Sequence, residues 1–144
     1  MAHVRKQIRD AVIARLVGAT AAGARVSANR TIAPALSQCP FIVVEVSRTS
    51  VDPATMGSAL MRELSVDVVI HVAQSSNAAD ALDAIAVQVE QALDVDLPVI
   101  VSDLVLTGDE IDEERAGPGE IAALRMQYLV TVVTDGPETI LEVV

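Results

Sequence analysis

The residues of this chain best suited to chemistry are an aspartate and a histidine on one predicted strand, Asp67 and His71. A carboxylate and an imidazole held together can transfer protons or bind a metal ion. Positions four apart on a strand share a face, yet they lie about 13 Å from each other. No single ligand or hydrogen bond spans that distance, so we expect neither a catalytic pair nor a metal site here.

A second candidate is a run of carboxylates that could bind calcium, Asp109-Glu110-Ile111-Asp112-Glu113-Glu114. An EF-hand loop needs alternating oxygen ligands, a central glycine and a distal glutamate, and this run lacks that spacing. The sequence also has no glycine-rich phosphate loop, no Ser/His/Asp pattern and no paired-thiol motif. We therefore expect a solvated acidic segment, no catalytic residue, no cofactor and no metal, in a protein that is not an enzyme.

Composition limits the possible partners. The chain has 144 residues, the size of one domain, and 51% of them are hydrophobic, yet it has one Phe, one Tyr and no Trp. So few aromatic side chains argue against base stacking on single-stranded nucleic acid. The lone Cys39 excludes an internal disulfide and is expected to be a small buried hydrophobic residue. No apolar stretch is long enough for a signal peptide or a membrane span, which predicts a cytoplasmic site of synthesis.

Charge is sorted along the chain. Residues 1–48 contain seven basic and two acidic residues, whereas the remaining residues contain three basic and eighteen acidic ones. The formal net charge is −10, which argues against general affinity for DNA. Such asymmetry indicates interactions with partners rather than a particular fold.

Hydrophobic periodicity predicts two helices and five strands. Val4, Ile8, Val12 and Leu16 share one face of a first helix that ends near Gly18. Strict alternation from residue 60 to residue 73 predicts a long antiparallel strand. The other strands are expected at 25–28, 41–48, 99–107 and 122–134, and the second helix from Asn77 to about Leu93. We expect mobile loops near 49–58 and 108–120, and a C-terminal tail over residues 136–144.

The predicted fold class is α+β, with the order α-β-β-β-α-β-β. Its sheet is mainly antiparallel and four- to five-stranded, and both helices pack on one face. The opposite face is then open and mixed in character, as is common for association surfaces. Its predicted residues are Glu45, Asp67, His71, Arg125, Gln127 and Thr131, interspersed with Val69, Leu129 and Val133.

With this element order, the chain resembles the tail terminator (minor tail protein U-like) family of siphophages, the phages with long, non-contractile tails. The segments that carry the resemblance are the basic opening helix at 3–9, the strand entry Cys39-Pro40-Phe41-Ile42-Val43-Val44, the strand at 62–72, the helix at 81–93, and 104–107 with the acidic segment and returning strand. The resemblance covers nearly the whole chain, as one domain over residues 1–144.

The resemblance implies a structural virion protein located in the tail and assembled in the host cytoplasm. Members form a homo-hexameric ring that caps the tail tube, stops its polymerisation and offers a joining surface to the head–tail connector protein. DNA passes through the ring without specific binding, and no cofactor or membrane is involved. The alternatives are a head–tail connector (stopper) protein or, in another class, a small cytoplasmic enzyme or ligand-binding domain.

The charge sorting supplies candidates for the contacts between subunits or with the tube. A cyclic ring joins one patch to a different patch of the next subunit, and opposite charges steer that encounter. The acidic segment at 108–120 is also our candidate for the lining of a bore that repels DNA. The candidate residues are Arg5, Arg9, Arg25, Arg30, Arg48, Asp109, Glu110, Asp112, Glu113 and Glu114.

Overall fold

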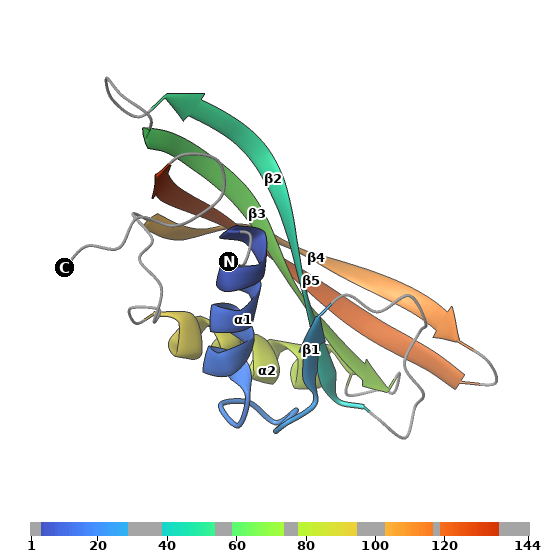
Figure 1. Cartoon of the computed structure of the whole chain (residues 1–144). Coiled ribbons are helices and arrows are strands. Elements are labelled where there is room, and N and C mark those ends of the chain that lie inside the picture. The colour runs from blue at the N-terminus through green and yellow to red at the C-terminus, as the bar shows by residue number, and fades with distance from the viewer. Residues whose placement is uncertain are drawn as a thin grey trace.

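A computed structural model describes residues 4–28, 39–53, 59–73, 78–94, 103–116 and 119–135 (Figure 1). Within these residues the chain forms two helices and five strands. The helices are α1 (Val4–Leu16) and α2 (Ala78–Leu93). The strands are β1 (Val26–Ala28), β2 (Phe41–Pro53), β3 (Ala59–Ala73), β4 (Asp103–Ala116) and β5 (Gly119–Asp135).

The strands form one five-stranded sheet in the order β1-β2-β3-β5-β4. The short β1 pairs with β2 in parallel, and every other pair is antiparallel. The α+β class and the element order are therefore confirmed, with the difference that the sheet is mixed. Parallel pairing follows from the long connection between β1 and β2, which lets the chain return to the same end of the sheet before β2 begins.

Both helices pack on the same face of the sheet, as predicted. The stripe of α1 is fully buried, and α2 buries Leu82, Ile85, Val89 and Leu93 on its own apolar side. Against them the sheet presents alternate residues of its central strands, which are Leu64, Val66, Val68, Ile70 and Val72 of β3 and Leu124, Met126, Tyr128, Val130 and Val132 of β5. Each large aliphatic side chain buried in this layer contributes about 1.5–3 kcal/mol to stability.

Helix α1 ends where the sequence predicts. The amide of Ala19 donates to the carbonyl oxygen of Leu16 at 3.0 Å, which closes the last turn. Gly18 then adopts a φ of 75°, in the left-handed region that glycine enters without a steric clash at Cβ. The chain turns at Gly18, whose amide donates to the carbonyl oxygen of Gly23 at 2.9 Å. This turn leads into β1.

The four long strands extend past the helices at both ends of the sheet, and the β4–β5 hairpin projects clear of them (Figure 1). The prediction of a loop at 108–120 is therefore wrong, because β4 continues through the acidic run to Ala116 and β5 starts at Gly119. Acidic residues have low strand propensity alone, but pairing with an apolar strand overrides it, and charge suits an edge strand. Residues 117–118 lie outside the described residues.

The predicted loop at 49–58 is also partly wrong. β2 continues to Pro53 and pairs with β3 after a register shift between Arg48 and Ser50, while residues 54–58 lie outside the described part. β4 is described from Asp103, so residues 99–102 of the strand predicted at 99–107 lie outside the described part, and β4 carries a register shift between Leu106 and Gly108. The predicted tail at 136–144 is outside the described residues, and the mobility expected of these segments stays a prediction.

Candidate functional site

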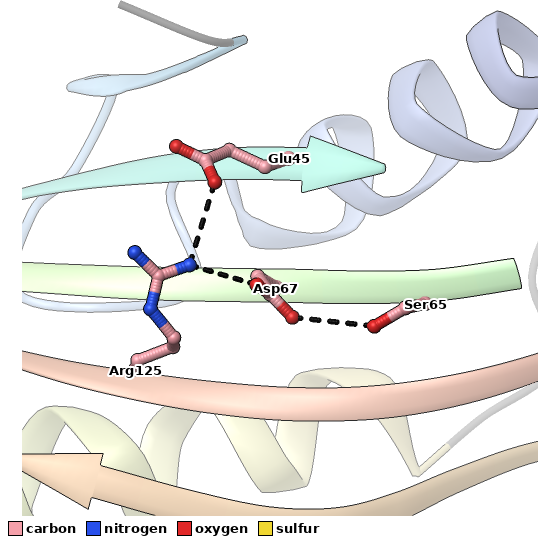
Figure 2. Close-up of polar contacts among 4 residues, drawn as sticks. All are labelled: Glu45, Ser65, Asp67 and Arg125. Atoms are coloured by element: carbon pink, nitrogen blue, oxygen red, sulfur yellow. Dashed lines mark hydrogen bonds and ion pairs between the residues drawn. The ribbon is translucent and has the colours of Figure 1, made fainter. Parts of the chain in front are cut away.

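The open face of the sheet carries an ionic cluster that spans three strands (Figure 2). Arg125 of β5 donates from Nη1 to Asp67 Oδ2 of β3 at 2.7 Å and to Glu45 Oε2 of β2 at 3.4 Å. The hydroxyl of Ser65 donates to the other carboxylate oxygen of Asp67 at 3.4 Å. One guanidinium thus holds two carboxylates that face each other across the β2–β3 ladder, where Glu45 pairs with Asp67.

The cluster is partly shielded from water, which strengthens it. The Arg125 and Asp67 side chains are 28% and 21% exposed. Burial lowers the pKa of Arg125, but the hydrogen bonds and charges of Asp67 and Glu45 raise it more, so the pKa lies above its usual value. Arg125 therefore stays charged at any relevant pH. The arrangement orders charges on the surface of the sheet.

The two residues that suggested acid–base chemistry have separate structural roles. Asp67 is bound to Arg125, whereas the ring of His71 stacks on that of Phe41, with centroids 4.5 Å apart. His71 is 6% exposed, and Val43, Val69 and Ala123 on the same face are buried as well, so this end of the face that was predicted to be open is shielded from solvent. Among the described residues, no group of three or more His, Cys, Asp or Glu side chains could hold a metal ion.

The acidic run is divided between the two sides of the β4–β5 hairpin. Glu110 pairs with Arg125, Asp112 with Ala123, and Glu114 with Ile121, and these β5 positions belong to the open face. Asp109 and Glu113 pair with Met126 and Ala122, which belong to the helix-covered side. Three of the five candidate acids therefore extend the open face, beyond the cluster of Glu45, Asp67 and Arg125.

The basic candidates lie elsewhere in the fold. Arg5 and Arg9 are on α1, which packs on β2, β1 and α2, while β4 packs on β5. Arg25 precedes β1 and its Nε donates to the carbonyl oxygen of Pro40 at 2.9 Å. Arg48 belongs to β2, at the register shift, and Arg30 lies outside the described residues. Helix α1 and the acidic strand β4 therefore pack against different elements of the fold.

The tertiary structure reveals side-chain contacts and a hollow that the sequence did not predict. Alternation places Glu45, Asp67 and Arg125 on one face, but the ionic cluster depends on the β2–β3–β5 register, which no local pattern encodes. An apolar hollow of about 360 Å³ was also not predicted. Its walls come from the loop before β2, the end of β3 and α2, and its lining includes Cys39, Pro40, Val72, Ile85 and Gln88.

No helix among the described residues is long and apolar enough to cross a membrane. No protein-family model matches the sequence, and no curated protein matches it either. A solved structure with a similar fold is a chain from the virion of the native gene transfer agent (GTA) particle. It is 18% identical, the TM-score is 0.52, and the alignment covers 92% of each chain. The two chains therefore share a fold over nearly their whole lengths.

Proposed function

We propose that this protein is a structural component of a phage or phage-like particle, located in the assembled virion. The observation that carries the proposal is the shared fold with a chain of the gene transfer agent virion, which extends over 92% of both chains. Because the alignment covers nearly all of both chains, it favours a similar role for the two whole domains. The ionic cluster of Arg125, Asp67 and Glu45 links three strands of the sheet, which is consistent with a structural role.

More specifically, we propose the role of a tail terminator. In this role, six copies form a ring on the tail tube, stop its polymerisation and provide the surface that the head–tail connector joins. The sequence resemblance to that family supports the terminator role. The α-β-β-β-α-β-β order supports it as well, with the acidic run on the first strand of the long β4–β5 hairpin. Particles of this kind assemble in the host cytoplasm, and the ring requires no cofactor.

The contacts between copies are proposed to join the basic α1 side to the acidic open face and hairpin of the next copy. Arg5 is exposed on α1, and the facing surface would contain Glu110, Asp112 and Glu114 at the register positions that extend the open face. Within one chain α1 packs on β1, β2 and α2, whereas β4 packs on β5, which supports a contact between chains rather than within one. Surplus acid on the hairpin would line the bore and repel the phosphates of passing DNA.

Light scattering after size exclusion, combined with electron microscopy, tests the ring directly. We expect a six-copy ring at high protein concentration and its dissociation as salt rises, because exposed ion pairs weaken when screened. Arg5→Glu should impair assembly while leaving the circular dichroism spectrum unchanged. Asp83→Lys on the exposed side of α2 is the matched control and should assemble normally. A strictly monomeric chain at every concentration would contradict the terminator role.

A head–tail connector protein is the closest alternative, and mixing distinguishes the two. A terminator should bind the end of purified tail tubes and halt their growth, whereas a connector should bind only tubes that are already terminated. The alternative of a small ligand-binding domain is favoured by the apolar hollow beside Cys39. That alternative predicts a monomer in which a small apolar ligand slows modification of the Cys39 thiol, the chain's single cysteine.

A further inference from the structure

The apolar hollow beside Cys39 opens on the helix-covered side of the sheet. Its volume of about 360 Å³ lies within the usual range of ligand pockets. The lining includes two core side chains, Val72 and Ile85, which are 5% and 3% exposed, so a small part of each is open to a bound group. Exposed small residues form the rim, namely Ala21, Ala73, Ala81 and Ala84. A rim of alanines leaves space for the larger aliphatic side chains of a partner.

Exposed apolar side chains continue on both sides of the hollow. Among the described residues, the two large hydrophobic side chains that are exposed are Val17, at 45%, and Val87, at 51%. Val87 is next to Gln88, which lines the hollow, and Val17 is four residues before Ala21. The amide of Ala21 donates to Gln88 Oε1 at 2.9 Å, which holds the loop after α1 against α2. An exposed apolar surface around a hollow is typical of an interaction site.

The segment after β5 carries side chains that suit this hollow. Residues 136–144 lie outside the described residues and read Gly-Pro-Glu-Thr-Ile-Leu-Glu-Val-Val, with four aliphatic residues and no aromatic one. The segment also contains two acids, Glu138 and Glu142, and no basic residue. At the edge of the hollow, the exposed Arg25 donates from Nε to the carbonyl oxygen of Pro40 at 2.9 Å. The segment thus matches the hollow in apolar character, and Arg25 supplies a partner for one of its acids.

The chain cannot place this segment in its own hollow. β5 ends at Asp135, which pairs with Ala59 at the start of β3, whereas the hollow lies at Val72 and Ala73, the last residues of β3. β3 runs between these two ends of the sheet (Figure 1). At about 3.2–3.4 Å per residue, the two ends are about 45–48 Å apart along the strand. A fully extended chain covers about 3.6 Å per residue, so Val144 lies within about 32 Å of Asp135. The occupant therefore comes from a different copy.

We propose that residues 136–144 of one copy dock in the apolar hollow of a second copy. The aliphatic residues of the segment pack on Val72 and Ile85, between the alanines of the rim, and Glu142 pairs with Arg25. The contact joins one end of the sheet to the opposite end of the next copy, which is the head-to-tail geometry of rings and filaments. The proposal rests on the self-association in the proposed function, but on neither six copies nor a tail tube.

Binding of the segment as a peptide tests the hollow directly. The probe is a fluorescein-labelled peptide of residues 136–144 with an amidated C-terminus, titrated with the full-length protein at concentrations at which the protein is dispersed. We expect a saturable rise of the fluorescence anisotropy. A peptide with Leu141→Ser and Val143→Ser should bind at least tenfold more weakly, because two buried aliphatic side chains are lost. Binding that does not saturate, or equal affinity of the two peptides, would overturn the proposal.

Two substitutions on α2 separate the hollow from the rest of the helix surface. Ala84→Glu places a charge at the rim and should weaken peptide binding at least tenfold, because docking would bury that charge. Ala79→Glu adds the same charge at an exposed position of α2 outside the lining and should leave binding unchanged. Both positions are exposed, so both variants should fold, which circular dichroism verifies. Equal weakening by the two substitutions would place the peptide elsewhere and refute the proposal.

Cys39 reports whether the hollow is covered in the intact protein, because it lines the hollow and is the chain's single cysteine. Alkylation by iodoacetamide should slow several-fold as the protein concentration rises and copies associate. In the full-length protein with Leu141→Ser and Val143→Ser, the rate should stay high at every concentration. A rate in the intact protein that is independent of concentration would assign the hollow to the same chain or to a small apolar molecule, and the proposal would be wrong.

The docking proposal and the terminator role fail separately. Copies that associate through residues 136–144 without forming a ring on tail tubes would contradict the terminator role and leave the docking contact standing. A six-copy ring that forms normally in both the Ala84→Glu protein and the Leu141→Ser, Val143→Ser protein, with no peptide binding to the dispersed chain, would overturn the docking contact and leave the ring.

Discussion

Deprotonation of Tyr128 is expected to destabilise the fold at alkaline pH. Burial, and to a lesser extent the charge of Glu90, raises the pKa of Tyr128 to about 12 from an ordinary value of 10.0. Because the pKa in the folded state lies above that in the unfolded chain, folding favours the neutral phenol. Its contribution to stability is fully present below pH 10 and is lost as the pH rises from about 10 through about 12.

The magnitude follows from the size of this shift. Each pKa unit corresponds to about 1.4 kcal/mol of differential stability, so a shift of about two units corresponds to about 2–3 kcal/mol. That is a substantial part of the 5–15 kcal/mol that stabilises an ordinary domain. Replacing Glu90 with Gln removes the second cause of the shift and should lower the pKa, with burial maintaining the larger part.

Absorbance of the phenolate measures the pKa at one site, because Tyr128 is the single tyrosine and there is no tryptophan. Urea unfolding followed by circular dichroism at a series of pH values measures the loss of stability. Tyr128→Phe is the control, and it should lack most of the loss between pH 10 and pH 12. Tyr128→Phe should also be at least as stable as the natural protein at neutral pH, since the buried Tyr128 hydroxyl forms no hydrogen bond with the described residues and its removal relieves a desolvation cost.

Two results would refute this reasoning. A folded protein whose tyrosine titrates near pH 10 would mean that the phenol is hydrated rather than buried. An unchanged pH dependence in Tyr128→Phe would assign the alkaline loss to other groups. Besides Tyr128, the side chains that titrate in this range are Lys6, which is the chain's single lysine, and the Cys39 thiol, whose pKa is raised by burial.

Two further predictions concern the sheet and the first turn. Arg125→Met should lower the free energy of unfolding by about 1–2 kcal/mol in urea titrations. A double-mutant cycle with Asp67→Asn should give a coupling energy of about 1 kcal/mol that decreases as salt is added. If the losses in the two single variants simply add up in the double variant, the 2.7 Å contact between the two side chains contributes nothing to stability and the prediction is wrong. Gly18→Ala should lower the free energy of unfolding by about 1 kcal/mol, because Gly18 has a φ of 75° even though an added Cβ would meet no neighbouring atom. Gly108→Ala is the control and should be nearly neutral, because Gly108 has no positive φ. Equal effects of the two substitutions on thermal unfolding would contradict this reasoning.

Local patterns predicted the elements that carry the core. The stripe of Val4, Ile8, Val12 and Leu16 predicted α1 and its burial, and alternation along residues 60–73 predicted β3 and its covered face. These predictions succeed because one buried face is repeated at the period of the element, which makes the local signal strong. The end of α1 at Gly18 was equally predictable, since glycine is the residue that tolerates its φ.

The acidic run shows where a local pattern fails. Six residues with one apolar member, Ile111, have neither the composition nor the alternation of a strand, so a loop was the natural expectation. They form a strand because β5 beside them is long, apolar and already anchored in the core, and its outer edge needs hydrogen-bond partners. The site candidates were affected in the same way, since Glu110 and Asp109 fall on opposite sides of the hairpin.

The sequence by itself determined the fold class, the two helices, the helix-covered faces of β2, β3 and β5, and the separation of positive from negative charge along the chain. Each of these depends on the types and spacing of neighbouring residues. Only the tertiary structure decided that Arg125 holds Glu45 and Asp67, that Tyr128 lies unpaired beside Glu90, and that the acidic run is a strand. Those outcomes depend on strand register and on contacts between residues distant in sequence, which no local pattern encodes.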